Sequence, residues 1–461
     1  MRKPYTVLLV LIFLLGLILR LYRFDFPIAD WHSWRQTDTS AVSRIFAEKG
    51  FDILHPKYLD ISNIQTGVNN PEGLRFVEFP LYNIFQAGTF KYIGVLTIEE
   101  WGRVVAIVSS LLTGLFLYLL AKEYFGKRTA FFSLIFYLFL PFSIYYGRTI
   151  LPDTTMIMTS FGGIYFFSRY IREKSNKKYL FLILSSILTS SAILLKPYAV
   201  FFVLPQLYLA VDKYRNRFLL KIELWLHLIL SILPFMLWRI WISNFPEGIP
   251  ASSWLLNGNG IRFRPAFFRW ILYERLAKLI LGYFGILFIF FGFLNLRKSK
   301  KYLFALSFLA SSIIYVVVFA TGNVQHDYYQ ILIIPSIALI AGFGLDYLFS
   351  KGRIYQFLSI CILLLSFFIS MNQVKDYFNI NNEAIVIAGR RANEILPIEA
   401  KVIAPYDGDT TFLYYINRKG WPAFQSSVEE LKHLGAKNDI NGFGKMYEVV
   451  ELRREYLILK L

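Results

Sequence analysis

The stretch VLLVLIFLLGLILRL at residues 7–21 is followed shortly by WHSWRQTDT at residues 31–39. The first stretch is apolar and approaches the length of about 20 residues that a helix needs to cross a hydrocarbon core of about 30 Å. The second places an aspartate, an arginine, a histidine and two tryptophans beside that span. Charged groups are costly to bury in or near lipid, so this concentration needs a reason. It suits a site that handles a polar group attached to a lipid.

The rest of the chain repeats the apolar pattern. Of its 461 residues, 56% are hydrophobic and only 17% are charged, whereas a soluble protein of this length carries more charge. We therefore predict an all-α, polytopic membrane protein with about eleven transmembrane helices. The predicted spans are 5–22, 101–121, 129–147, 155–171, 179–195, 198–212, 221–241, 277–296, 302–320, 329–348 and 354–371.

Basic residues predict the orientation of these spans. Arg2, Lys3 and five basic loops fall on one side when eleven spans are threaded in order. The basic loops are 122–128, 172–178, 213–221, 297–301 and 351–353. Because positive loops stay cytoplasmic, we expect a cytoplasmic N-terminus, an extracytoplasmic C-terminus and a retained signal anchor in a plasma or inner membrane. The net charge of +18 is therefore a topology signal and does not indicate a partner nucleic acid.

Two long loops are expected outside the membrane. The loop 23–100 contains two candidate surface helices, one over 38–50 and one that begins at Pro80, a favoured first helical residue. The loop 242–276 is rich in arginine and turn residues, and it ends in another candidate surface helix over 265–276.

The C-terminal tail, residues 372–461, is predicted to be a small soluble α/β domain that follows a transmembrane catalytic domain, residues 1–371. Three short apolar runs, 386–387, 402–404 and 412–415, alternate in the tail with helical or turn segments such as 426–434. This alternation is the reason for the α/β prediction.

Asp38 is the leading catalytic candidate. A carboxylate shielded by Trp31 and Trp34 can take a proton from an acceptor hydroxyl. The structural alternative is that Asp38 only caps the helix that follows it, because aspartate is a favoured N-cap residue. The sequence leaves both roles open.

A second group of candidates lies at the ends of predicted spans. Arg148 and Asp153 flank a hinge, and both are expected to face the same interfacial cavity as Asp38. Asp153 is then a further catalytic candidate, or it could simply start the next helix, and Arg148 could pair with a phosphate or a carboxylate. Lys196 is a lone cation on the outer side and a candidate for binding phosphate. His326, Asp327 and Tyr328 form a short outer loop that either binds substrate or is a solvated turn with interfacial tyrosines.

Arg35 and Glu78 complete the candidate site. Arg35 shares the polar stretch with Asp38 and could bind substrate, whereas Glu78 is a catalytic candidate ahead of the second surface helix. Glu78 could instead favour only the dipole of that helix, or join Asp38 and a histidine around a divalent metal. No cofactor is expected to be required, because two carboxylates and scattered histidines are weak evidence for a metal.

Several short motifs occur in a distinctive order along the chain. They are WRQTD at 34–38, FVEFP at 76–80, WGRV at 101–104, the hinge RTILPD at 148–153 and HDYYQ at 326–330. In this order they resemble membrane glycosyltransferases of the GT-C fold. The resemblance is to the phospholipid-carrier-dependent branch, which includes protein mannosyltransferases and lipid A aminoarabinose transferases.

The resemblance implies a GT-C fold and transfer of a sugar from a polyprenyl-phosphate monosaccharide, with inversion at the anomeric carbon. It maps the presumed catalytic base onto Asp38, the hinge aspartate onto Asp153 and the basic residue before it onto Arg148. The aminoarabinose transferases carry a lysine after the glutamate, where this chain has Phe79. The expected partners are a polyprenyl-phosphate-linked sugar, membrane lipid, and a glycan, lipid or protein acceptor.

Two other functions fit the same hydrophobicity. A flippase for a lipid-linked glycan tends to have two related halves and polar residues at mid-membrane, whereas here the ionisable residues gather at the ends of spans. A glycan ligase or polymerase that uses a diphosphate-linked donor would also act at the outer face.

Overall fold

The structure is a computed structural model that describes residues 3–424, 436–440, 448–452 and 457–460, so the segment predicted at 426–434 lies outside the described residues. The chain forms two compact units. The helical unit comprises residues 1–24, 104–237 and 252–376, and the mixed unit comprises residues 25–103, 238–251 and 377–461. The predicted division at residue 371 stays a prediction.

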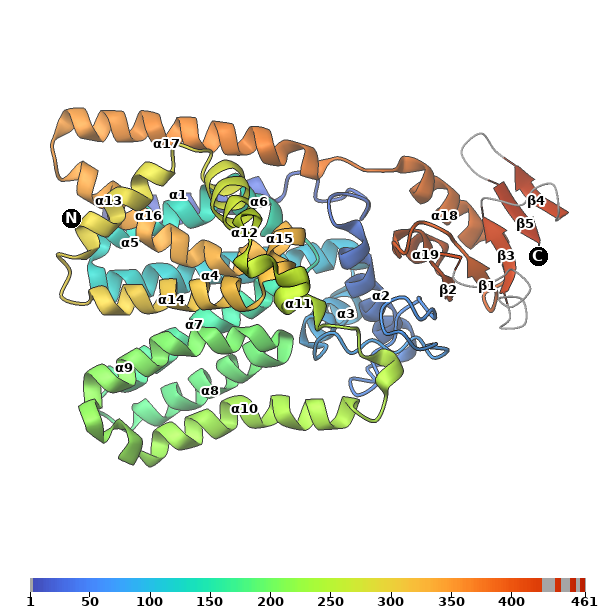
Figure 1. Ribbon diagram of the computed structural model, residues 1–461, viewed down its shortest axis with the longest axis horizontal. Coiled ribbons are helices and arrows are strands. Elements are labelled where there is room, and N and C mark those ends of the chain that lie inside the picture. The colour runs from blue at the N-terminus through green and yellow to red at the C-terminus, as the bar shows by residue number, and fades with distance from the viewer. Residues whose placement is uncertain (1–2, 425–435, 441–447, 453–456, 461) are drawn as a thin grey trace. The chain divides into compact units, whose positions relative to one another are not determined.

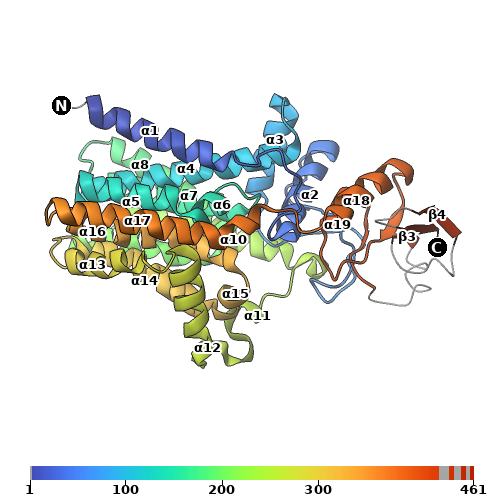
Figure 2. The same cartoon turned by 90° about the horizontal axis from the view of Figure 1, so that it is seen from above.

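The helical unit consists of helices, most of which lie side by side in both ribbon views (Figures 1 and 2). They are α1 (Lys3–Arg20), α4 (Ile98–Phe125), α5 (Lys127–Phe139), α6 (Pro141–Tyr146), α7 (Pro152–Arg172), α8 (Lys177–Leu195), η1 (Pro197–Val203), α9 (Leu204–Tyr214), η2 (Arg215–Leu220), α10 (Ile222–Ile242), α11 (Trp254–Asn257), η4 (Gly258–Phe263), α12 (Pro265–Phe268), η5 (Arg269–Ile280), α13 (Ile286–Leu296), α14 (Tyr302–Val318), α15 (Ala320–Gln325), η6 (Asp327–Ile333), α16 (Ile334–Phe349) and α17 (Arg353–Val374). The first residues of α4 and the last residues of α10 belong to the mixed unit.

The predicted spans fall on helices, and the chain is a multi-pass membrane protein. In the described part of the chain, five helices are long and apolar enough to cross a membrane, and three shorter apolar helices accompany them. Two predicted spans are interrupted. The span 129–147 divides before Pro141, which cannot continue the hydrogen-bond ladder, and the span 277–296 divides at 281–285, where Gly282 and Tyr283 have positive φ. The number eleven stays a prediction.

Glycine allows the closest helix contact of this unit. A Cβ atom on Gly344 of α16 would lie 1.9 Å from the carbonyl oxygen of Phe288, and one on Gly292 of α13 would lie 2.2 Å from that of Ile340. Without a side chain at either position, α13 and α16 approach backbone to backbone. Small residues at helix contacts are typical of membrane proteins, where packing replaces the hydrophobic effect between helices.

A buried arginine joins α1 to the helices around it. Arg20 donates to the carbonyl oxygens of Gly16 (3.0 Å) and Leu138 (3.1 Å). It also donates to the carbonyl oxygen of Ser143 (3.2 Å) and the hydroxyl of Ser110 (3.1 Å). The break before Pro141 interrupts the helical ladder at the end of α5, where the guanidinium of Arg20 supplies a donor for the carbonyl oxygen of Leu138.

The mixed unit holds two helices from the first predicted outer loop and a sheet from the tail. Its elements are α2 (Ser33–Lys49), α3 (Leu81–Ile93), η3 (Pro246–Gly248), α18 (Glu383–Ile395), β1 (Lys401–Ile403), α19 (Thr411–Ile416), β2 (Gly420–Trp421), β3 (Ala436–Ile440), β4 (Glu448–Leu452) and β5 (Leu457–Lys460), and η7 (Lys375–Phe378) leads into it. The strand order is β2-β1-β3-β5-β4 (Figure 1). Strand β1 is parallel to β2 and β3, whereas β5 is antiparallel to β3 and β4.

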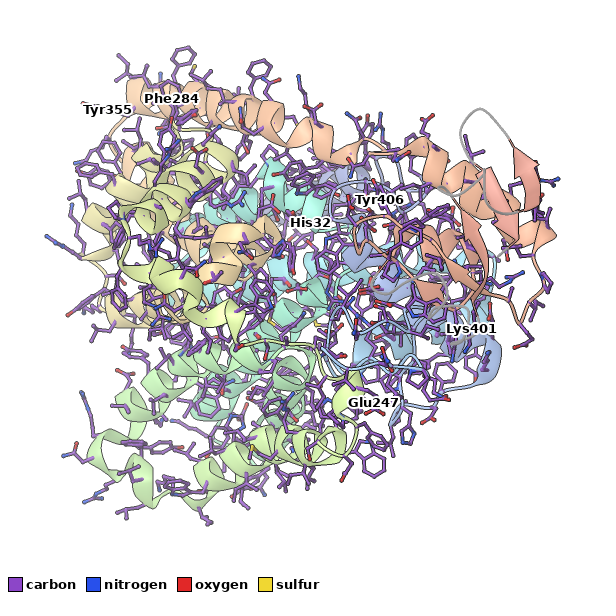
Figure 3. The ribbon with its side chains drawn as sticks, turned by 45° about the vertical axis from the view of Figure 1, so that its right-hand side comes forward. His32, Glu247, Phe284, Tyr355, Lys401 and Tyr406 are labelled. Atoms are coloured by element: carbon purple, nitrogen blue, oxygen red, sulfur yellow. The ribbon has the colours of Figure 1, made fainter. Side chains whose placement is uncertain are left out.

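The prediction for the first surface helix was wrong at its start. Helix α2 begins at Ser33, after His32, whose backbone is left-handed (φ 56°, ψ 37°; Figure 3). The helix buries polar residues as well as its apolar side, and amide groups of α3 bind it. Asn83 donates to the carbonyl oxygen of Thr39 (2.7 Å), and Gln86 accepts from Ser43 (2.8 Å). The second surface helix, α3, starts at Leu81, next to the predicted Pro80.

Two apolar runs of the tail are helical, so they do not supply strands. Residues 386–387 lie in α18 and residues 412–415 lie in α19, whereas residues 401–403 form β1. In α18, Ile385, Ala388 and Ala392 are buried at helical spacing, and this periodicity outweighs the β-branched pair at 386–387.

We predict that Arg20→Leu destabilises the protein by about 2–4 kcal/mol, because carbonyl groups buried at the α5–α6 break lose their donor. Thermal unfolding in lipid nanodiscs should show a lower midpoint, with Arg20→Lys in between. Leu15→Ala is a control on the same helix, at a side chain that is 48% exposed. An Arg20→Leu variant that melts with the parent would contradict this account of the α1 contact.

Candidate functional site

Asp38 lies in the second turn of α2, so it does not cap that helix. Its carboxylate is 1% exposed and forms an ion pair with Arg75, Oδ2 to Nη2, at 2.7 Å. Thr410 donates its hydroxyl to Oδ1 at 2.6 Å, and Gln65 approaches Oδ2 at 3.5 Å. The capping alternative is therefore wrong.

The side chains around Asp38 also hold one another. Arg75 donates to the amide oxygen of Gln65 at 2.8 Å, and its guanidinium lies 4.6 Å from the ring centre of Tyr58. A carboxylate has about four acceptor positions, and the three partners of Asp38 use three of them. Among the described residues, no protein donor takes the fourth position, on Oδ1.

The negative charge of Asp38 helps to raise the pKa of two further carboxylates, Asp60 and Asp409. Burial raises the pKa of Asp60 to about 6, and the negative charge of Asp38 adds to this effect while Arg75 opposes it. Burial also raises the pKa of Asp409, again with Asp38 contributing. Arg75 is thus a cation that acts on two buried carboxylates, Asp38 from α2 and Asp60 from the loop after it.

Arg35 and Glu78 bind each other. Arg35 Nη2 lies 2.8 Å from both carboxylate oxygens of Glu78, and the two side chains are 3% and 7% exposed. The cavity beside Glu78, also lined by Arg75, has a volume of only about 10 Å³, which holds no more than a water molecule. This ion pair fixes the end of the loop that carries Arg75 against α2.

In the helical unit, Asp153 lies in the first turn of α7 and is 2% exposed. Tyr198 donates its hydroxyl to Asp153 at 2.9 Å. The ammonium group of Lys196 lies 4.0 Å from the other carboxylate oxygen, close enough for an ion pair and too far for a hydrogen bond. The start of α7 is also favourable for a negative charge.

Asp327 has a similar environment at the start of η6. Tyr146 donates to it at 2.6 Å, and Arg275 forms an ion pair with it at 3.9 Å. The His326 ring lies 5.5 Å from that of Tyr328, centre to centre.

Three tyrosine rings lie close together beside these groups. The Tyr198 ring lies 6.2 Å from that of Tyr329, which in turn lies 4.6 Å from that of Tyr328.

Arg148 is buried and donates to the carbonyl oxygen of Arg23 at 3.0 Å.

The predicted site residues therefore belong to two units. Asp38, Arg35 and Glu78 lie in the mixed unit, whereas Arg148, Asp153, Lys196, His326, Asp327 and Tyr328 lie in the helical unit. A common cavity for both groups stays a prediction. Within the described residues, no three His, Cys, Asp or Glu side chains gather as metal ligands.

Sequence reasoning named Arg35 and Lys196, which pair with Glu78 and Asp153, but it missed other partners of these carboxylates. Arg75 could have been found, because a charge inside the apolar segment LRFVEF is unusual. Thr410, Gln65 and Tyr198 carry no such signal, since each is an ordinary polar residue far along the chain from the group it binds.

Comparisons with known proteins support the fold. Residues 78–241 match the family of dolichyl-phosphate-mannose-protein mannosyltransferases, and no curated protein matches the chain. The crystal structure of ArnT from Cupriavidus metallidurans bound to undecaprenyl phosphate aligns with a TM-score of 0.70 and 15% identity, over 100% of this chain and 98% of that chain. The same protein in the apo state gives a TM-score of 0.66 and 14% identity, over 99% and 98%.

An oligosaccharyltransferase is also similar. The Archaeoglobus fulgidus enzyme in complex with Zn and sulfate aligns with a TM-score of 0.60 and 11% identity, over 93% of this chain and 67% of that chain. Archaeal AglB from Archaeoglobus fulgidus, in complex with an inhibitory peptide and a dolichol-phosphate, aligns with a TM-score of 0.54 and 10% identity, over 94% and 69%. The resemblance expected from the motifs is confirmed, and the family match and the shared GT-C fold indicate that this chain is a membrane glycosyltransferase.

Proposed function

We propose that the protein transfers a monosaccharide from a polyprenyl-phosphate donor to a lipid, glycan or protein acceptor, with inversion, and that Asp38 is the base. The observation that carries this proposal is the set of contacts that Asp38 makes with Arg75 and Thr410. The carboxylate is buried, its charge is compensated by Arg75, and one acceptor position remains for a hydroxyl group.

The chemistry follows from the donor. The acceptor oxygen attacks the anomeric carbon while its proton passes to Asp38, and the bond from that carbon to the phosphate oxygen breaks. The phosphate leaves as a stable anion, so the reaction needs cations near the phosphate more than a general acid. A single displacement of this kind inverts the anomeric centre.

Arg148 and Lys196 are proposed to bind the donor phosphate. Both are buried cations next to the ends of helices of the helical unit, and Lys196 lies beside a carboxylate that can orient it. We propose that His326, Asp327 and Tyr328 bind substrate beside them. The solved ArnT structure with undecaprenyl phosphate and the AglB structure with a dolichol-phosphate support a lipid-phosphate carrier.

The other candidates are proposed to position the reacting groups. Asp153 holds Lys196 and Tyr198, and Glu78 holds Arg35. The Arg35–Glu78 ion pair fixes the segment from which Arg75 reaches Asp38, so it acts on the base through Arg75.

A second candidate function is transfer of a whole glycan to a peptide. The similarity to the Archaeoglobus fulgidus oligosaccharyltransferase favours it, because 93% of this chain aligns with that enzyme. Assay of purified protein with a polyprenyl-phosphate monosaccharide and with a diphosphate-linked oligosaccharide separates the two functions.

We predict that Asp38→Asn lowers the rate of sugar transfer by about 10²-fold or more, because the amide cannot accept the proton. The same change leaves Arg75 buried without its counter-ion, which costs about 3–5 kcal/mol of stability. Transfer and thermal unfolding should therefore be measured together on purified protein.

The double variant Asp38→Asn/Arg75→Gln separates the two effects, since it removes both charges of the pair. We expect it to regain much of the lost stability and none of the lost transfer. If transfer returns together with the melting temperature, Asp38 has a structural role only.

Donor binding should depend on Arg148 and Lys196. Each of Arg148→Gln and Lys196→Gln is expected to weaken binding of a polyprenyl-phosphate sugar by about tenfold, the effect of one lost hydrogen bond to a charged group. Lys122→Gln, at an exposed basic residue, is the matched control. Parental affinity in a folded variant would remove that residue from the phosphate site.

We also propose that the protein lies in the plasma or inner membrane, with the N-terminus in the cytoplasm and the active site outside. In a Cys361→Ala background, Ile398→Cys should react with an impermeant thiol reagent in right-side-out vesicles and Ser175→Cys in inside-out vesicles. Ile398 is 80% exposed, and Ser175 is also exposed. The reverse labelling pattern would invert the topology.

A further inference from the structure

The mixed unit contains a cavity that the proposed reaction does not use. It has a volume of about 370 Å³, within the range of about 300–1,000 Å³ for small-molecule sites. Residues from the end of α2, the start of α4, helix α18 and helix α19 line it. All of them belong to the same compact unit.

This cavity is separate from Asp38. Arg44, which lines it, follows Asp38 by six residues on α2, which is about 9 Å along the helix and about 240° around it. Among the described residues, none of the side chains that hold Asp38 lines the cavity, since Arg75, Gln65 and Thr410 all lie outside its lining. The cavity therefore opens on another side of α2.

The wall of the cavity is a built polar network. Arg44 forms an ion pair with Glu99 at 3.0 Å and lies 3.8 Å from the ring centre of Tyr414. The hydroxyl of Tyr414 donates to the same carboxylate of Glu99. Arg103, 1% exposed, donates to the carbonyl oxygen of Phe26 at 2.6 Å. These contacts hold the charged groups in place before a ligand arrives.

The charges of the lining decide the class of ligand. Four carboxylates and three guanidinium groups line the cavity, so their formal charges nearly cancel. A phosphate would meet the carboxylates and a polyamine would meet the arginines, whereas a neutral polyol can donate to the carboxylates and accept from the arginines. Aromatic rings of Phe90 and Tyr415 add apolar faces on which the C–H side of a sugar ring can lie.

We propose that this cavity binds a neutral saccharide unit, as a glycan subsite distinct from the reaction centre at Asp38. Its volume suits one or two sugar rings. The proposal rests on the proposed function only for the biological source of the glycan, because binding needs no transfer. A glycan bound here contacts groups on α2 and α19. Helix α2 also carries Asp38, and Thr410, at the start of α19, donates to Asp38.

The test is a titration of purified full-length protein in nanodiscs, since maltoside detergents carry sugars themselves. Methyl hexopyranosides of the manno, gluco and galacto series are followed by saturation-transfer NMR, with inorganic phosphate and spermidine as charged competitors. The Asp38→Asn/Arg75→Gln protein is used in parallel, so that loss of transfer and loss of binding are scored separately. We expect at least one hexopyranoside to bind both proteins, with no displacement by phosphate or spermidine.

Two neighbouring arginines of α18 provide a matched pair of variants. Arg390 lines the cavity, whereas Arg391 does not and pairs with Glu394 and Glu451. Arg390→Gln should weaken hexopyranoside binding by about fivefold or more, whereas Arg391→Gln should leave it unchanged. Glu99→Gln should weaken hexopyranoside binding by about tenfold. Absence of binding by every hexopyranoside, displacement by phosphate, or equal effects of the two arginine variants would overturn the proposal.

Discussion

A charged group that is buried away from water needs a counter-ion or a hydrogen-bonding partner inside the protein, and this constraint organises the structure. In lipid, even backbone groups need internal partners. Arg20 donates to the carbonyl oxygen of Leu138 at the break before Pro141, and Asp153 contacts Tyr198 and Lys196. In the mixed unit, Arg75 lies among buried carboxylates of which Asp38 is one. Each buried charge thus fixes several segments at once.

The same constraint shapes the chemistry available to Asp38. Arg75 lets the carboxylate keep its charge without water, and Thr410 fixes the plane of the group. In the proposed reaction, a carboxylate held in this way cannot rotate to follow a substrate, so the acceptor hydroxyl would have to approach from one direction. That rigidity favours a narrow range of acceptor positions, which is one way for a transferase to keep water from acting as the acceptor.

The sequence predicts the spans and the general region of the site, because a run of apolar residues has few structural alternatives and a charged stretch beside it is exceptional. The interruption of the predicted span 277–296 at residues 281–285 could not be predicted, since it depends on the close approach of this backbone to another helix. Asp38 was predicted as a site residue from the residues next to it in sequence, whereas Thr410, which donates to it, lies 372 residues further along the chain. The run at 412–415 shows why short apolar segments mislead, as the same residues fit a strand or a buried helix until their packing is known.

Arg20 has a consequence for the order of assembly. Its acceptor at Leu138 is 118 residues further along the chain, so α1 is synthesised long before that acceptor exists. A nascent chain that ends before residue 138 can form only the contacts of Arg20 with Gly16 and Ser110. Docking of the first helix is therefore a stepwise process, which begins against α4 and is completed only after α5 and α6 have been made.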